Sequence, residues 1–109
     1  MRDTTELTAA AERFADRLRA APQSRLQRGA AAEGLALARE LAARAQRLEN
    51  PEREPRIMPD AGVFAVADQL AVAAADLAES MRTAPAGAPG GDLDEAVELV
   101  RAAEARSGL

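Results

Sequence analysis

The sequence contains no cysteine, histidine, lysine, tryptophan or tyrosine, and its only aromatic residues are two phenylalanines. Without cysteine, the chain has no disulfides, no thiolate nucleophile and no cysteine-based metal site. Without histidine, it lacks the usual general base near neutral pH and the commonest ligand of transition metals. Glycine-rich phosphate loops, Ser-His-Asp sets, zinc-ligand spacings and dinucleotide-binding fingerprints are also missing. We therefore predict a protein that is not an enzyme and has no catalytic residue, no cofactor and no metal site.

Segments that would direct the chain to a membrane are scarce as well. The first six residues lack the apolar core and the cleavage site of a secretory signal. The longest apolar run, residues 61–78, is rich in alanine and carries Asp68, Gln69 and Asp76, which makes it a poor membrane span. We expect a cytoplasmic protein without a membrane partner.

Alanine and arginine dominate the residues that are present. Alanine occupies 29 positions, Val, Ile, Leu, Met and Phe together occupy 23, and all 14 basic residues are arginine, a pattern typical of a GC-rich bacterial genome. Burying one large apolar side chain contributes roughly 1.5–3 kcal/mol, whereas ordering a chain of this size costs on the order of 100–200 kcal/mol. Close packing of alanine, helix propensity or a second subunit must therefore supplement the large side chains.

Charge is unevenly distributed along the chain, whose net charge is −4. Residues 1–59 carry 11 Arg and 9 acidic residues, whereas residues 60–109 carry 3 Arg and 9 acidic residues. This asymmetry favours docking between the two halves of the chain or between two chains. The acidic total argues against nucleic acid as the principal partner.

Apolar residues at alternating spacings of three and four predict four helices. Pro22 either breaks or kinks the chain between the first and the second helix. The second and third helices have matched lengths and are joined by a stiff connector, residues 50–60, that contains three prolines. We predict an all-α protein: a small antiparallel bundle of four helices, with a long hairpin of helices 2 and 3 and shorter helices 1 and 4. The expected helix bounds are residues 4–21, 24–50, 60–82 and 92–107.

Capping residues mark three of the helix starts. Ser24 and Gln27 have the spacing of a capping box, and so do Asp92 and Glu95. Asp60 is expected to cap the third helix, because aspartate is a preferred residue at that position.

These elements predict one domain with a loosely tethered C-terminal helix. Residues 1–82 form a three-helix core that includes the connector, and residues 83–91 form a flexible Ala/Gly/Pro linker. The helix in residues 92–109 packs either on the same core or on a partner chain, and the sequence leaves both arrangements open.

The helix expected at residues 60–82 is apolar over a wide arc. Phe64 and Val66 broaden its main apolar seam, and Val72 interrupts its polar stripe. In the preceding helix, Gly34 and Ala38 belong to a row of small residues that indicates a close helix crossing or, as a second choice, a ligand slot. These features predict a homodimeric protein–protein interaction module, with a different protein as the alternative partner. The expected interface residues are Gly34, Ala38, Val66, Leu70, Val72, Ala73 and Leu77.

Arginines in residues 13–28 define a second candidate site, a basic corner around the first turn of the bundle. Arg17, Arg25 and Arg28 would lie beside a helix N-terminus, where an anionic ligand or nucleic acid could bind, as in a small regulatory accessory protein. However, Glu12 and Asp16 interleave with these arginines, and no aromatic residue is available there to stack a base. A solvated face is the preferred interpretation, and nucleic-acid binding is not expected.

Three carboxylates, Asp68, Asp76 and Glu79, line one side of the third helix and could bind a cation or act as an acid–base pair. A di-iron arrangement would also require histidine. We interpret these residues as the polar stripe of an amphipathic helix.

The connector contains one apolar tract, Ile57 and Met58. This tract is either a docking loop or a seal over the end of the bundle above Phe64. The seal is the preferred interpretation, because the core is otherwise poor in large residues.

Overall fold

The structure, a computed structural model, describes residues 3–88 and 91–109. Within these ranges the chain is helical and contains no strand, which confirms the prediction of an all-α protein. The helical segments are α1 (Thr5–Ala20), α2 (Gln23–Arg25), the π-helical turn η1 (Leu26–Ala30), α3 (Ala31–Glu49), α4 (Val66–Thr83) and α5 (Leu93–Ser107).

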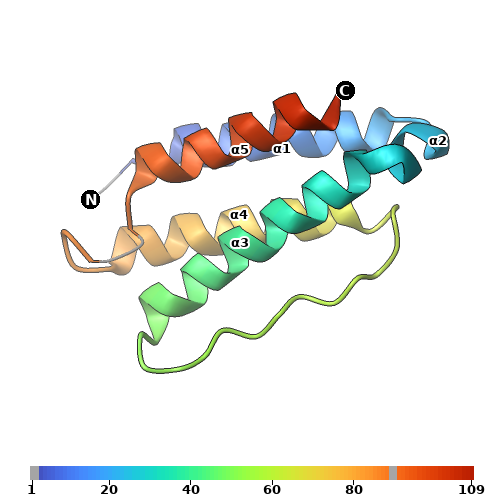
Figure 1. The fold of residues 1–109 in the computed structure, drawn as a ribbon. Helices are drawn as coiled ribbons and strands as arrows, with labels where there is room; N and C mark the ends of the chain where they lie inside the picture. Colours follow the sequence, from blue (N-terminus) through green and yellow to red (C-terminus); the bar gives the residue numbers. More distant parts are fainter. Residues whose placement is uncertain (1–2, 89–90) are drawn as a thin grey trace.

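Four of these helices form a bundle in which each packs mainly against two neighbours, in the circular order α1, α4, α3, α5. α1 and α5 run in one direction, and α3 and α4 run in the opposite direction (Figure 1). Arg82, near the end of α4, donates to the hydroxyl of Thr4 at the start of α1 (2.6 Å). At the other end of this pair, Arg19 donates to Asp68 (2.9 Å). The predicted small bundle of four helices is confirmed.

The predicted hairpin of the second and third helices is wrong, because α3 and α4 run parallel. Gly34 lies against Val66 where both helices begin, and the Ser80 hydroxyl donates to Glu49 where both helices end (2.9 Å). Residues 50–65 therefore return along the whole bundle before α4 starts (Figure 1). An extended chain advances about 3.3 Å per residue, so this segment easily spans the roughly 28 Å of the 19-residue α3.

Polar side chains of α3 and α4 hold this crossover segment in place. The side chain of Gln46 pairs with the backbone of Arg56, accepting from its N–H (2.8 Å) and donating to its carbonyl (3.1 Å). Farther along, Arg39 donates to the carbonyl of Met58 (2.8 Å), and Gln69 donates to the carbonyl of Pro59 (3.0 Å). The segment thus replaces the missing hairpin loop with a strip of extended backbone anchored by side chains.

Two glycines with positive φ move the helix starts away from the expected positions. Gly62 has a φ of 93°, and the carboxylate of Asp60 accepts from its N–H (2.8 Å), so Asp60 closes a tight turn instead of capping α4. Gly29 has a φ of 143° and separates the short α2 from α3, so the predicted single helix at residues 24–50 is interrupted. Only glycine adopts such backbone angles readily.

Pro22 breaks the helical conformation between α1 and α2 and does not merely kink it. It precedes α2 with an extended ψ of 153°, and no side chain caps that helix. The capping box expected at Ser24 is therefore absent, because Ser24 is the second residue of α2 and does not precede its first turn. By contrast, Asp92 caps α5 as predicted, accepting from the N–H of Glu95 (3.1 Å).

The core is built from a few large side chains separated by alanines. α5 contributes two alanines and two valines to the core, and it packs on α1 and α3 of its own chain. The linker expected at residues 83–91 includes Pro89 and Gly90, which lie outside the described residues. Over the part of the chain that is described, none of the helices combines the length and hydropathy needed to span a bilayer. The largest fully buried side chains are Leu7, Phe14, Leu41, Val66, Leu70, Leu77, Met81 and Val100.

Candidate interaction surfaces

Six of the seven residues expected at a dimer interface lie in the interior of the chain itself. Only Val72 is exposed, with 59% of its surface accessible. The apolar arc of α4 is wide because α4 packs against both α1 and α3, so neighbours within one chain cover most of it. The covered residues are Gly34, Ala38, Val66, Leu70, Ala73 and Leu77.

The close helix crossing expected at Gly34 is present and joins three helices. A Cβ placed on Gly34 would lie 2.7 Å from Cγ1 of Val66 and 3.0 Å from Cδ1 of Leu18. These separations are well inside the roughly 3.5–4.0 Å of an ordinary carbon–carbon contact. The glycine therefore allows α1, α3 and α4 to meet closely, and it leaves no slot for a ligand at this point.

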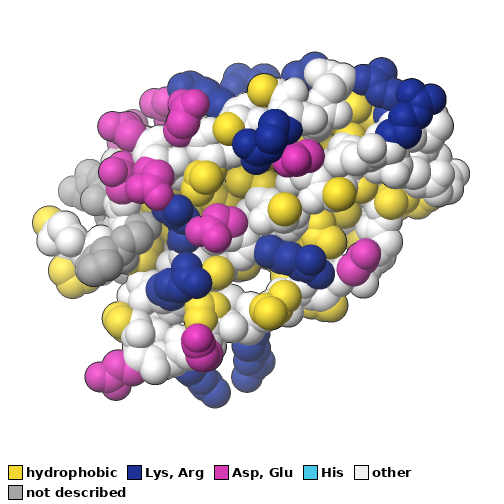
Figure 2. Space-filling model, in the orientation of Figure 1, with side chains coloured by type: hydrophobic (Ala, Val, Ile, Leu, Met, Phe, Trp, Pro, Cys, Tyr) yellow, Lys and Arg dark blue, Asp and Glu magenta, His cyan; other side chains and the backbone are white. Residues whose placement is uncertain are grey.

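The basic corner is largely occupied by the C-terminal end of α5. Arg17 donates to the backbone carbonyl of Leu109, and Arg25 donates to the backbone carbonyl of Gly108. Arg28 is exposed and makes no ion pair with any described residue. Figure 2 shows arginines gathered over the α2–η1 end of the molecule and acidic side chains over the first turns of α5. Two of the three arginines expected to bind an anion are thus engaged by carbonyl oxygens of the same chain.

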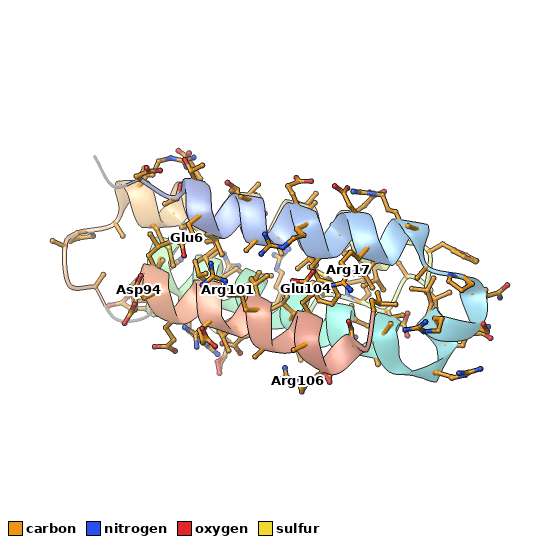
Figure 3. The ribbon with its side chains drawn as sticks, turned by 90° about the horizontal axis from the view of Figure 1, so that it is seen from above. Glu6, Arg17, Asp94, Arg101, Glu104 and Arg106 are labelled. Atoms are coloured by element: carbon orange, nitrogen blue, oxygen red, sulfur yellow. The ribbon has the colours of Figure 1, made fainter. Side chains whose placement is uncertain are left out.

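Ion pairs also connect α5 to α1. The side chain of Glu104 is only 11% exposed, and its carboxylate lies between two arginines of α1, 3.1 Å from Arg17 and 3.7 Å from Arg13. Nearer the start of both helices, Arg101 pairs with Glu6 (3.2 Å). Figure 3 shows Glu6, Arg17, Arg101 and Glu104 between the two helices. These contacts have no counterpart in an isolated helix, so sequence periodicity gave no sign of them.

Two arginines bridge carboxylates from different elements, and both have a raised pKa. The pKa of Arg19 is raised chiefly by its hydrogen bond to Asp68, which opposes partial desolvation. For Arg44, burial lowers the pKa, but hydrogen bonds to Glu40 and Glu95 outweigh it. Both guanidinium groups are therefore fixed cations that tie neighbouring helices together.

The acidic stripe of α4 is partly neutralised by arginines. Asp68 pairs with Arg19 (2.9 Å), and Glu79 pairs with Arg82 one turn away. In the described ranges, no group of three or more acidic side chains is arranged to hold a metal ion. The stripe is a solvated helix face crossed by ion pairs.

The apolar tract of the connector is split between two environments. Ile57 is 81% exposed, whereas Met58 is partly buried and packs against the core. Phe64 is 71% exposed, so the connector does not form the seal that was expected above it. The sequence pattern assigned Phe64 to the apolar seam of a helix, but residue 64 lies in the turn before α4 and is rotated out of that seam.

An apolar hollow of 280 Å³ opens next to this turn. It is bounded by residues of η1, by the first turns of α3 and by the turn at residues 60–63, with Val66 at the start of α4. Nothing in the linear sequence indicates this hollow, because its lining residues come from segments far apart in the chain. Its apolar lining residues are Leu26, Ala31, Ala32, Leu35, Val63 and Val66.

Comparison with known proteins gave no relative: no protein-family model, no curated protein and no solved structure matches this chain. The function is therefore argued from the geometry of the bundle and its exposed side chains.

Proposed function

We propose that this chain is a non-enzymatic protein–protein interaction module that pairs with a second copy of itself through the face carrying Phe64. The observation that carries this proposal is the 71% exposure of Phe64. The chain has 23 large apolar residues, of which only two are aromatic. One of these two, Phe64, lies on the surface. Aromatic side chains are enriched among the residues that dominate binding energy at protein interfaces.

Val72 is a second exposed apolar residue and lies in α4, eight residues after Phe64. It is 59% exposed. Single exposed apolar residues are ordinary on protein surfaces. Two large ones this close in the sequence, in a chain so poor in large side chains, favour a binding surface.

Opposite charge at the two ends of the molecule allows two copies to attract each other before they meet. Arginines gather at the α2–η1 end and acidic side chains at the first turns of α5, at the other end of the bundle (Figure 2), so this attraction acts during encounter and not at the Phe64 face itself. Opposite potentials accelerate encounter and set orientation more than they add affinity. Because the apolar patch is small, we expect a transient dimer of the kind formed by interfaces below about 1,200 Å².

Solution mass measured by size-exclusion chromatography with light scattering tests the proposal. Detection uses refractive index, because the chain has no Trp or Tyr. We expect the average mass to rise from monomer towards dimer with concentration, and Val72→Asp to weaken this rise. Ala9→Asp places the same charge on an exposed position of α1 and serves as the matched control. A mass that stays monomeric at every concentration would contradict the proposal.

A further inference from the structure

We propose that a pocket between the end of α3 and the start of α5 binds a small amphipathic anion, an apolar molecule that carries one acidic group. This site goes beyond the proposed self-association and does not depend on it. The pocket lies at the end of the bundle where α3 ends, the chain leaves α4 and α5 begins (Figure 1). Its volume of 530 Å³ falls within the range of small-ligand pockets, about 300–1,000 Å³.

Apolar side chains from three segments of the chain line this pocket. Leu48 comes from the last turn of α3, Pro51 comes from the crossover segment, and Pro85 and Ala88 follow α4. None of these four side chains can form a hydrogen bond, so the body of a ligand that fills the space between them must be apolar. Apolar walls with a few polar groups are the composition expected of a small-molecule site.

One charged group of the pocket is held in place by the protein itself. The side chain of Arg44 is 16% exposed. Its Nε donates to Glu40 (2.7 Å) and its Nη2 donates to Glu95 (2.7 Å), and both carboxylates also line the pocket. Because the guanidinium group is planar, these two bonds fix its orientation. They leave Nη1 without a partner among the described residues.

Arg47 supplies the positive charge that selects an anion. It lies three residues after Arg44 on α3, lines the pocket and is exposed. Of the four charged residues that line the pocket, it alone makes no ion pair with a described residue. Unpaired arginines are preferred binding groups for anionic oxygens. A cation would instead meet Glu40 and Glu95, whose carboxylates Arg44 already engages.

Two fluorescent probes that differ in one charged group test this site. Anilinonaphthalene sulfonate is an apolar aromatic anion, phenylnaphthylamine is the same molecule without the sulfonate, and the chain has no Trp or Tyr to interfere with their fluorescence. We expect the sulfonate probe to saturate at one molecule per chain. Arg47→Gln should raise its dissociation constant by on the order of 10-fold and leave that of the neutral probe unchanged. Arg28→Gln is the matched control, because Arg28 is also exposed but lies at the opposite end of the bundle.

A further variant distinguishes this pocket from the apolar hollow beside η1. Ala32→Arg places a long side chain at an exposed position that lines the hollow, and it should leave binding of the sulfonate probe unchanged. Far-UV circular dichroism verifies that each variant is folded. The inference is overturned if Ala32→Arg, and not Arg47→Gln, weakens binding, because the probe then occupies the hollow.

Two other results would also overturn the inference. One is the absence of saturable binding at one probe per chain. The other is an Arg47→Gln variant that binds both probes as the wild type does, or that weakens both equally, because the pocket then does not select an anion. Self-association is measured by solution mass without a probe, so each of these results leaves the proposed function to be decided separately.

Discussion

Replacing Gly34 with alanine should destabilise the bundle, although alanine is the better helix former. Gly34 lies inside α3, where the change from Gly to Ala by itself adds about 1 kcal/mol of helix stability. The added methyl group would, however, lie 2.7 Å from Cγ1 of Val66 and 3.0 Å from Cδ1 of Leu18. Both neighbours are 2% exposed and belong to different helices, so neither can yield without disturbing the packing of α1 or α4.

The expected magnitude follows from these two opposing terms. Adding a methyl group to a tightly packed core costs about 1–3 kcal/mol. We place Gly34→Ala in the upper part of that range, because the nearest atom belongs to a β-branched side chain with restricted rotamers. After subtracting the gain in helix propensity, the free energy of unfolding should fall by about 1–2 kcal/mol. For a domain of this size the melting temperature should drop by about 4–12 °C.

Thermal and urea unfolding followed by far-UV circular dichroism would measure this change, since the chain lacks Trp and Tyr. Ala36→Gly, at an exposed position of the same helix, isolates the propensity term and should cost about 1 kcal/mol. In a Val66→Ala background the obstructing Cγ1 is gone, so Gly34→Ala should become neutral or stabilising. A Gly34→Ala protein as stable as wild type, or more stable, would refute the packing argument.

Two further predictions concern how α5 is held. Glu104→Gln leaves Arg13 and Arg17 without their shared carboxylate. The free energy of unfolding should therefore fall by about 1 kcal/mol at low salt and by less at high salt, because salt screens the ion pairs. Urea unfolding at two ionic strengths would measure both losses. An equal loss at both ionic strengths would argue against an electrostatic role. Asp92→Ala removes the cap that accepts from the Glu95 N–H and should cost about 0.5–2 kcal/mol, whereas Asp92→Asn should retain most of the stability. Equal stability of the alanine and asparagine variants in the same assay would contradict the capping role.

Sequence patterns predicted those features of the structure that depend on interactions between residues close together in the chain. The helical periodicity of α1 and α5, the break at Pro22 and the cap at Asp92 each depend on residues within one or two turns. The small-residue position at Gly34 also correctly indicated a close crossing, because a glycine inside a helix is costly unless packing requires it. Signals of this kind are readable without knowing which helices are neighbours.

Predictions that depended on how the helices are arranged relative to one another were wrong. Aspartate is a typical N-cap residue, but the turn with a positive φ at Gly62 separates Asp60 from the start of α4, so Asp60 does not cap that helix. Phe64 fits the apolar seam on a continuous helix, yet the same turn directs it to solvent. Val66, Leu70 and Leu77 were assigned to a partner chain, because the sequence does not specify that α1 and α3 of the same chain cover them.

The sequence by itself determined that this chain forms amphipathic helices with a thin, alanine-rich core and that it contains no histidine or cysteine. Only the tertiary structure decided that α3 and α4 run parallel and that α5 occupies the basic corner. It also decided that Phe64 is exposed and that its neighbour Val63 lines an apolar hollow. The reason is physical: propensity, periodicity and capping act over a few residues, whereas helix direction and the covering of a face depend on contacts between residues far apart in the chain.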